Sequence, residues 1–472
     1  MVFNSVSFLI FFVLVLGLYQ LALPWAARKA LLLVASYYFY AAFNIAFTPI
    51  LLFTTVVDWI ATNRMARLDH PRARLPWLLL SLASNLGLLG FFKYGNFLQE
   101  NAIRLLASAG VGYQPALWNI VLPAGISFYT FQSLSYTIDI YRGTCRPARS
   151  FLDFAVFVSF FPQLVAGPIV RAKDFLPQLD VPRRATGAQL AWGLLLLLFG
   201  LFQKIVLADA TLAPVVNATY DAATRLSTLD AWTGTLAFAA QIFFDFAGYS
   251  TCAIGVAMCF GFALPDNFRH PYAAAGFSDF WQRWHISLSS WLRDYLYIPL
   301  GGNRRGLPRT YANLCVTMLL GGLWHGADWR FVIWGGLHAA YLCGERVVVW
   351  LWPAWLLPWA RVRLLGAMLL TFFLVCLTWV FFRASSFERA ASILNSMFVA
   401  RLRPSKVDAS MLGLALAVVA GLLLYQWAVR NKTAEQIWSG IPRWLQAGLV
   451  ALALFLILAT PVQQQVFIYF QF

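Results

Sequence analysis

The sequence predicts an all-α, polytopic membrane protein, and composition, apolar segments and charge distribution each support that prediction. Of the 472 residues, 61% are hydrophobic and only 11% are charged, whereas an average soluble domain has about 25% charged residues. The mean hydropathy is +0.68. Because the core of a water-soluble protein could not bury so many apolar side chains, much of the protein surface must face lipid.

Apolar stretches long enough to cross a bilayer recur along the whole chain. A helix needs about 20 apolar residues to span the hydrocarbon, and we find no alternation typical of membrane strands. The clearest stretches are 1–27, 30–57, 75–92, 105–138, 185–203, 364–382, 409–429 and 444–472. Shorter or interrupted ones lie at 151–170, 231–263, 310–327 and 331–360. Together they predict about eleven to thirteen membrane helices, with interfacial or re-entrant helices among them.

Positive charge is concentrated in the short loops between these stretches. Arg28 and Lys29 follow the first stretch, and the next basic loop, 64–74, comes two stretches later. The positive-inside rule therefore places the N-terminus outside the cytoplasm. Residues 1–5 carry no positive charge, and the apolar run is too long for a cleaved signal peptide. The net charge of +16 is typical of a membrane protein whose basic loops set its topology and contact anionic lipids. We therefore do not expect nucleic-acid binding.

Several patterns are missing from the sequence. It has no low-complexity linker and no convincing internal repeat, so we expect one membrane domain over residues 1–472. The six cysteines are scattered without a CxxC pair, which argues against a metal site and against disulfides. Neither HExxH nor GxSxG occurs, so metalloprotease and hydrolase activities lack support.

The most polar long stretch, 264–310, contains an ordered pattern. A helix over 279–295 would place its aromatic and leucine residues on one stripe and its charged residues opposite. The stripe consists of Trp281, Trp284, Leu288, Trp291, Leu292 and Tyr295. This pattern predicts a helix at the membrane interface, N-capped by Ser278, with His285 at the edge of the stripe. The following Gly- and Arg-rich turn, 298–306, could bind phosphates, although a turn that only sets topology is the simpler interpretation.

Only five histidines occur, and two of them, His325 and His338, lie in apolar segments. His325 has glycines on both sides, and a neutral imidazole at that depth could act as a general base. A buried histidine with a purely structural hydrogen bond is an equally good interpretation. His338 follows thirteen residues later, about 220° around an ideal helix. Because 328–330 interrupts the run, we expect the two histidines on different helices that converge.

Three other polar residues lie in apolar segments: Lys204, Asp139 and Asp245. Each could line a cavity or form a structural ion pair. For Lys204 and Asp139 we favour the structural role.

Six long motifs stand out in the sequence: FWQRWHISLS at 280–289, WLRDYLYIPLGGN at 291–303, GLWHGA at 322–327, WGGLH at 334–338, FPQLVAGPI at 161–169 and YTIDIYRG at 136–143. Together they resemble the signature of the bacterial membrane-bound O-acyltransferase (MBOAT) family, and within it the membrane subunits of alginate O-acetyltransferases. The resemblance is strong over about 120–345. One departure is Thr251-Cys252, where family members often have Asp-Met.

The resemblance implies a fold around a central tunnel in the bacterial inner membrane. It also implies acetyl-CoA as the acyl donor, no metal, and a periplasmic acetylesterase-like partner. The product would be an O-acetylated exported polysaccharide, alginate-like or cellulose-like. The catalytic histidine would be His325, with His285 near the tunnel. We assign donor binding to Arg293, Arg304, Arg305, Trp324 and His338.

Two alternatives remain open on the sequence alone. The same fold could transfer D-alanine to teichoic acid, although the many arginines and the alginate-type motifs speak against it. A polysaccharide or lipid transporter would also use intramembrane His and Asp, but it gives no reason for the Trp-His-Gly motif at 324–326.

Overall fold

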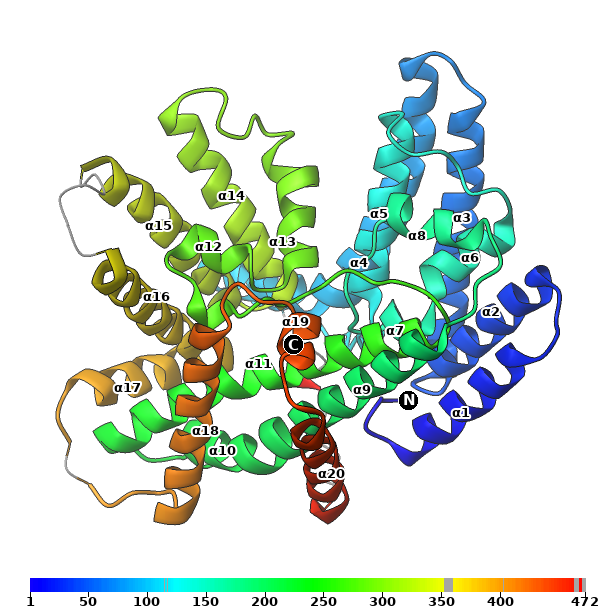
Figure 1. The fold of residues 1–472 in the computed structure, drawn as a ribbon. Helices are drawn as coiled ribbons and strands as arrows, with labels where there is room; N and C mark the ends of the chain where they lie inside the picture. The colour runs from blue at the N-terminus through cyan, green and yellow to red at the C-terminus, as the bar shows by residue number, and fades with distance from the viewer. Residues whose placement is uncertain (114, 117, 352–359, 402, 462–466, 469–472) are drawn as a thin grey trace. The chain divides into compact units, whose positions relative to one another are not determined.

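A computed structural model of the chain describes all residues except 114, 117, 352–359, 402, 462–466 and 469–472 (Figure 1). Every regular element among the described residues is a helix, which confirms the predicted all-α class. In this part of the chain, six helices are long and apolar enough to cross a membrane, and two shorter apolar helices accompany them. The six are Ile45–Ala66, Pro71–Ser108, Gly187–Tyr220, Thr228–Cys259, Leu364–Arg383 and Ala409–Ala428.

This count is below the eleven to thirteen spans expected from hydropathy, because turn residues divide several apolar stretches. The stretch 1–27 breaks before Pro24, which precedes the second helix. The stretch 30–57 breaks at Asn44, whose side chain caps the next helical turn. Apolar composition marks what lies in lipid, whereas capping residues decide where each helix ends.

By their internal contacts the described residues form two compact units. Unit 1 comprises residues 1–197 and 252–265, and unit 2 comprises residues 198–251 and 266–472. The helices of unit 1 are α1 (Val6–Gln20), α2 (Trp25–Ala41), η1 (Ile45–Phe47), α3 (Thr48–Ala66), α4 (Pro71–Ser108), α5 (Ile126–Tyr141), α6 (Phe151–Ser159), α7 (Phe161–Leu164) and α8 (Ala172–Leu179). Helices α9 (Gly187–Phe202) and α11 (Thr228–Cys259) each contribute residues to both units.

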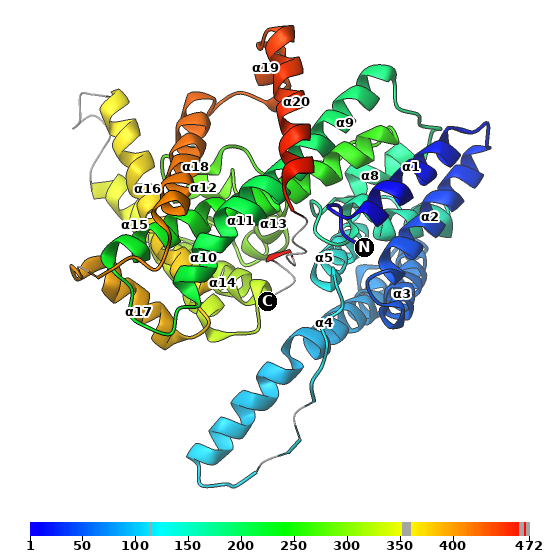
Figure 2. The same cartoon turned by 90° about the horizontal axis from the view of Figure 1, so that it is seen from below.

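A buried polar group holds α3 and α4 together in unit 1. The carboxyl group of Asp58 is fully buried. Its Oδ1 accepts hydrogen bonds from Ser81 Oγ at 2.5 Å and from Asn85 Nδ2 at 2.9 Å. Asn85 Nδ2 also lies 3.0 Å from Oδ2. Such side-chain hydrogen bonds between helices replace the hydrophobic driving force that is lost in lipid. The second half of α4 extends beyond the other helices of its unit (Figure 2).

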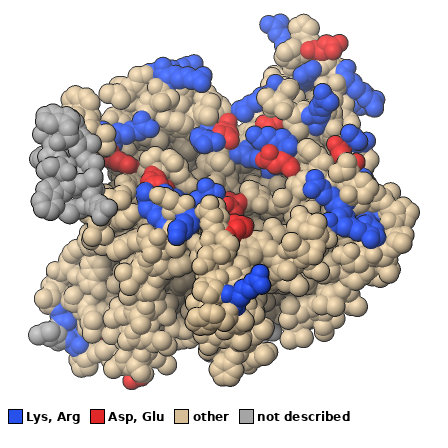
Figure 3. All heavy atoms as spheres, in the orientation of Figure 1, with Lys and Arg blue, Asp and Glu red and all other residues tan. Residues whose placement is uncertain are grey.

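Unit 2 contains four of the six motifs, those between residues 280 and 338. Its remaining helices are η2 (Gln203–Leu212), α10 (Ala213–Tyr220), η3 (Pro271–Ala273), α12 (Phe277–Trp281), α13 (Ile286–Leu292), η4 (Arg293–Tyr297), α14 (Leu307–His325), α15 (Trp329–Leu351), α16 (Ala360–Arg383), α17 (Phe387–Phe398), α18 (Ala409–Ala428), α19 (Ala434–Ser439) and α20 (Arg443–Ala459). Two of these, η2 and η4, are π-helices. The surface over α18, which carries no charged residue, is uniformly tan in Figure 3.

Glycines bring α14 and α15 into close contact, and the two helices lie side by side in Figure 1. A Cβ atom on Gly322 would lie 2.2 Å from the carbonyl oxygen of Phe331. A Cβ atom on Gly335 would lie 2.3 Å from the carbonyl oxygen of Met318. Only glycine permits this backbone approach. It places the end of α14, which carries a histidine, against the first two turns of α15.

The predicted single helix over 279–295 is wrong. The chain forms α12, breaks at 282–285, and resumes as α13 and η4. His285 adopts a left-handed backbone conformation with φ of 43°, and the N–H of Ile286 donates to the carbonyl of Asn267 instead of continuing a helix. Ser278 is not the N-cap, because α12 begins after Gly276. The periodicity is correct locally, but tertiary hydrogen bonds interrupt the helix.

Candidate functional site

The three histidines of the sequence motifs all lie in the interior of unit 2. His285 and His338 are 0% exposed and His325 is 3% exposed. His285 precedes α13, His325 ends α14, and His338 lies in α15. Each side chain therefore comes from a different element.

Two tryptophans connect these histidines into one aromatic cluster. Trp324 lies between His285 and His325, with ring-centroid distances of 5.8 and 5.1 Å. Trp334 lies between His325 and His338, at 4.9 and 4.6 Å. This confirms that His325 and His338 occupy different helices, and it shows that they converge. His285 joins them through a segment that the sequence placed on an interfacial helix.

The hydrogen bonds of His285 define its tautomer. The backbone N–H and Oγ of Ser287 lie 3.3 and 2.9 Å from the Asn267 side-chain atom assigned as Oδ1. A backbone N–H can only donate, so this atom must be the oxygen. Asn267 Nδ2 in turn donates to Ser250 Oγ at 3.1 Å. His285 Nδ1, 3.1 Å from the same oxygen, must therefore donate its proton, which leaves the lone pair on Nε2.

Burial keeps His285 neutral. Removal from water lowers the pKa of His285 from 6.5 to about 3, because desolvation disfavours the charged imidazolium. Its ring also packs edge-on against Phe246, with centroids 4.7 Å apart. At physiological pH the ring is therefore an uncharged group with Nδ1 protonated and a lone pair on Nε2.

His338 has the opposite tautomer. Its Nε2 lies 3.1 Å from Thr378 Oγ1, and that hydroxyl donates its own proton to the carbonyl of Val375 at 2.7 Å. Nε2 must then carry the proton and Nδ1 the lone pair. Within the described residues, Nδ1 of His338 has no hydrogen-bond partner. The ring nonetheless lies between Trp281 and Trp334, at 5.1 and 4.6 Å.

His325 lies at the junction of two glycine-dependent features. It is the last residue of α14, and Gly326 continues the chain in an extended conformation. A Cβ atom on Gly326 would lie 2.1 Å from the ring of Phe331, so a larger residue would displace the turn. The imidazole also packs edge-on against Phe382 at 5.4 Å. In the Trp-His-Gly motif, the glycine thus fixes the backbone next to His325, and aromatic rings pack against the imidazole of His325.

The aromatic cluster contains four indole N–H groups that have no hydrogen-bond partner among the described residues. They belong to Trp281, Trp284, Trp334 and Trp379. The last three are at most 1% exposed, and Trp379 contacts Trp284 and Trp334 at 5.1 and 5.9 Å. A buried unpaired donor costs about 1–3 kcal/mol. Several in one cluster are rare in native structures, and in this cluster they offer donors to a carbonyl oxygen or to water beside the histidines.

The five predicted donor-binding residues fall into two groups. Trp324 and His338 belong to the aromatic cluster, whereas Arg293, Arg304 and Arg305 are exposed. The guanidinium of Arg293 pairs with Asp294 at 2.8 Å. Arg304 and Arg305 precede α14, and His325 ends that helix, so about 27 Å of helix separates the basic turn from the imidazole. Arg304 and Arg305 can thus contact a donor only far from His325.

Lys204 forms a structural ion pair, as expected. Its ammonium contacts Asp209 Oδ1 at 2.9 Å and also pairs with Asp245. Asp245 Oδ2 in addition accepts the backbone N–H of Ile468 at 2.9 Å. The sequence does not point to Asp209, because five residues separate it from Lys204 and only the π-helix η2 brings such residues together. It does not point to Asn267 or Thr378 either, since nothing in their local sequence marks them.

Comparison with known proteins identifies the family. Residues 146–387, which include the three clustered histidines, match the membrane-bound O-acyltransferase family. The chain belongs to that family. This O-acyltransferase is 40% identical over 453 residues to the "probable alginate O-acetylase AlgI" of Azotobacter vinelandii, covering 94% of this chain and 88% of that protein.

Two further relatives of this O-acyltransferase carry related names. The "probable alginate O-acetylase AlgI" of Pseudomonas aeruginosa is 44% identical over 402 residues, covering 84% of this chain and 75% of that protein. The peptidoglycan O-acetyltransferase of Helicobacter pylori is 38% identical over 395 residues, covering 78% and 73%. The resemblance seen in the motifs is therefore confirmed, and the protein is a multi-pass membrane enzyme that transfers an acyl group to oxygen.

Proposed function

We propose that this O-acyltransferase takes acetyl groups from cytoplasmic acetyl-CoA for the O-acetylation of an exported cell-surface polysaccharide, with His325 as the catalytic base. The observation that carries the proposal is the buried cluster of three histidines around Trp324 and Trp334. The relatives named for alginate and peptidoglycan O-acetylation support acetyl as the acyl group and a polysaccharide as the destination.

The chemistry follows from the groups in the cluster. The acceptor hydroxyl gives its proton to the imidazole of His325 while its oxygen attacks the thioester carbonyl carbon. Negative charge then develops on the carbonyl oxygen, where indole N–H groups of the cluster can donate hydrogen bonds. The C–S bond breaks, and the proton passes from the imidazolium to the leaving thiolate. An acetyl ester and a free thiol result.

The other two histidines have supporting roles in this proposal. His285 holds its Nε2 lone pair on the other side of Trp324, where it can orient the acceptor hydroxyl. His338 offers Nδ1 as an acceptor, next to Trp334. Because the two have opposite tautomers, they present lone pairs through different ring nitrogens.

The proposed topology has the N-terminus outside the cytoplasm, in the inner membrane of a bacterium. Acetyl-CoA would approach the basic turn that contains Arg304 and Arg305, and the acetyl group would leave toward a periplasmic partner. Exposed guanidinium groups suit the phosphates of the donor.

Turnover of acetyl-CoA in proteoliposomes tests this proposal. His325→Ala should reduce acetyl transfer by about 10²–10⁴-fold, the usual contribution of a general base. His70→Ala is the matched control, because His70 is exposed at the start of α4 and should not change the rate. Equal rates for wild type and His325→Ala would contradict the assignment.

A further inference from the structure

A cavity of about 400 Å³ lies in unit 2, and none of the three clustered histidines lines it. Its apolar wall includes Phe243 and Phe244 of α11 and Leu422 of α18. Its polar lining includes Gln203, His270 and Tyr425. The volume falls within the range of small-molecule sites, and the mixture of apolar wall and polar rim suits an amphipathic ligand.

The cavity extends along two helices. Its lining residues run from position 243 to 251 along α11 and from 418 to 425 along α18. At 1.5 Å per residue, each wall is about 10–12 Å long. A slot of this length, lined by phenyl rings and branched aliphatic side chains, accommodates part of one hydrocarbon chain.

The cavity opens on a face of α18 that is suited to lipid. Helix α18 is one of the candidate membrane spans, and only 22% of its most apolar 18-residue segment is buried. Gly421 and Tyr425, which line the cavity, are both exposed, and α18 carries no charged residue. In a bilayer, the molecules that reach such an opening are lipids.

Cationic residues lie next to His270, one of the polar residues that line the cavity. His270 packs on Tyr425 with ring centroids 5.8 Å apart, and its Nε2–H donates to the carbonyl of Lys432 at 3.1 Å. The ammonium of the exposed Lys432 has no ion-pair partner in the described part of the chain. Arg269, next to His270, pairs with Asp266 at 2.9 Å, but both side chains are more than half exposed. Such a surface pair is weak and can be exchanged for a phosphate.

We propose that unit 2 binds one anionic phospholipid, with part of one acyl chain in this cavity and the head-group phosphate beside Lys432 and Arg269. The other cations nearby are already engaged, since Arg283 and Arg430 both pair with Asp279. The apolar wall selects a hydrocarbon chain, and the cationic rim selects a negative head group.

One wall of the cavity is also a wall of the histidine site. Phe268 contacts Phe243 with centroids 5.9 Å apart and lies nearly parallel to His285 at 6.5 Å. A chain in the cavity therefore supports the side of Phe268 that faces away from His285. The lipid site is thus placed to stabilise the position of that imidazole.

Filling the cavity provides the first test. A Cβ atom on Gly421 or on Gly413 of the same helix meets nothing within 4 Å, so leucine fits at either position without a backbone clash. Only Gly421 lines the cavity. The protein is reconstituted in phosphatidylcholine nanodiscs containing phosphatidylglycerol, and bound lipid is counted by native mass spectrometry after mild detergent extraction. Gly421→Leu should reduce the retained phosphatidylglycerol at least about tenfold, and Gly413→Leu should not change it.

Removing the positive charge provides the second test. Lys432→Gln should weaken the preference for phosphatidylglycerol over phosphatidylcholine severalfold, whereas Lys406→Gln, at another exposed lysine, should leave it unchanged. Unchanged phosphatidylglycerol retention in Gly421→Leu would overturn the chain site. Equal retention of the two lipids by the wild type would overturn the anionic head group.

Discussion

Both units bury polar side chains among apolar helices, but the Asp58 carboxyl group of unit 1 and the histidine cluster of unit 2 differ in how far their hydrogen bonds are satisfied. In unit 1, both carboxyl oxygens of Asp58 accept hydrogen bonds from neighbouring side chains. In unit 2, Nδ1 of His338 and the indole N–H groups around it lack partners among the described residues. Satisfied groups hold helices together, whereas unsatisfied ones remain available to a ligand. A polar residue at membrane depth therefore needs its partners examined before it is assigned a function.

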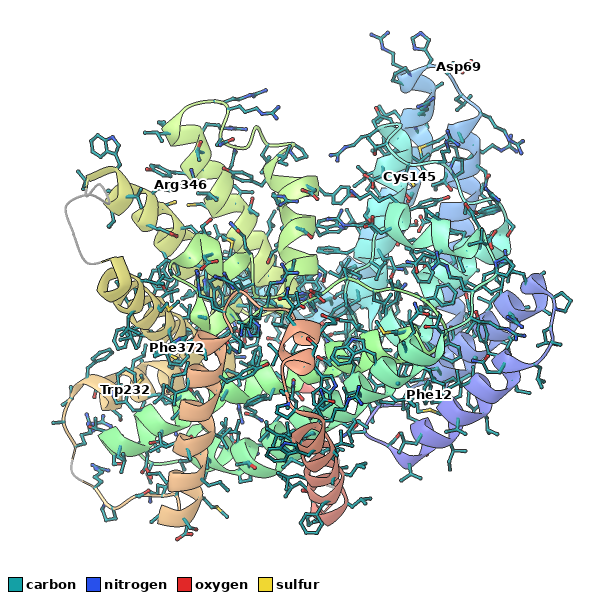
Figure 4. All side chains as sticks on the ribbon, viewed as in Figure 1. Phe12, Asp69, Cys145, Trp232, Arg346 and Phe372 are labelled. Atoms are coloured by element: carbon teal, nitrogen blue, oxygen red, sulfur yellow. The ribbon has the colours of Figure 1, made fainter. Side chains whose placement is uncertain are left out.

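The same contrast appears among the tryptophans of unit 2. The indole N–H of Trp232, labelled in Figure 4, donates to the carbonyl of Met397 at 2.9 Å and so joins α11 to α17. The indole N–H of Trp379 makes no such bond among the described residues. Phe372, also labelled there, packs on Tyr272 at 5.0 Å and extends the aromatic core from α16. A purely structural tryptophan is thus satisfied by the backbone, unlike those beside the histidines.

After the loss of turnover expected for His325→Ala, the largest effect should come from separating α14 and α15. Gly335→Ala would place a Cβ atom 2.3 Å from a backbone oxygen, whereas Gly336→Ala meets a flexible leucine side chain at 3.6 Å. We expect Gly335→Ala to destabilise the protein by about 1–3 kcal/mol and to reduce acetyl transfer by displacing His338 from His325. Thermal unfolding in detergent and turnover of the two variants provide the comparison. Equal behaviour of the two variants would show that the backbone contact does not position the site.

A smaller effect is expected from Asn267, which orients His285 without belonging to the aromatic cluster. Asn267→Leu removes the oxygen that accepts from Nδ1, and we expect about a tenfold loss in kcat, comparable to one hydrogen bond of about 1.4 kcal/mol. Asn267→Asp retains an acceptor and should recover part of the rate. If Asn267→Asp is no better than Asn267→Leu, Asn267 does not act through the His285 tautomer.

The lowered pKa of His285 predicts a modest sensitivity to acid. The unfolded chain takes up a proton near pH 6.5, whereas folded His285 does so only near pH 3. The folded state is therefore stabilised above pH 6.5 by this difference, and that stabilisation is lost progressively as the pH falls from 6.5 toward 3. Melting temperatures from pH 7 to 4 should fall more steeply for wild type than for His285→Gln. Parallel curves would mean that His285 is protonated alike in both states.

The smallest effect on activity should come from the Asp58 carboxyl group in unit 1, whose two oxygens both accept hydrogen bonds. Asp58→Ala leaves the donors of Ser81 and Asn85 without their acceptor and should cost about 1–3 kcal/mol of stability. Turnover per folded molecule should stay within about twofold of wild type, which corresponds to a barrier change of less than about 0.5 kcal/mol. A large loss of turnover in properly folded Asp58→Ala would break the distinction between the two clusters.

The sequence predicted the helical membrane class well, because composition and long apolar runs depend little on tertiary contacts. It could not place the breaks at Pro24 and Asn44 as helix ends, since hydropathy averages over single capping residues. The glycines on both sides of His325, visible in the sequence, allow a close approach, and in the structure Gly322 and Gly326 contact Phe331 of α15.

The site was only partly predictable, for reasons that particular residues make clear. The helical pattern around His285 was misleading, because its left-handed backbone depends on a hydrogen bond from a distant loop. Asn267 lies 18 residues from His285, and Thr378 lies 40 residues from His338. The packing of the helices decides which residues become partners, and the local periodicity of the sequence carries no information on that packing.

The acetyl ester content of the host's surface polysaccharide tests the central claim most directly. Wild type, His325→Ala and Asp58→Ala should be compared at equal amounts of folded protein in the membrane. We predict that acetylation disappears in His325→Ala and persists in Asp58→Ala. Acetylation that persists in His325→Ala would contradict the catalytic assignment, and its equal loss in both variants would contradict the distinction between satisfied and available polar groups.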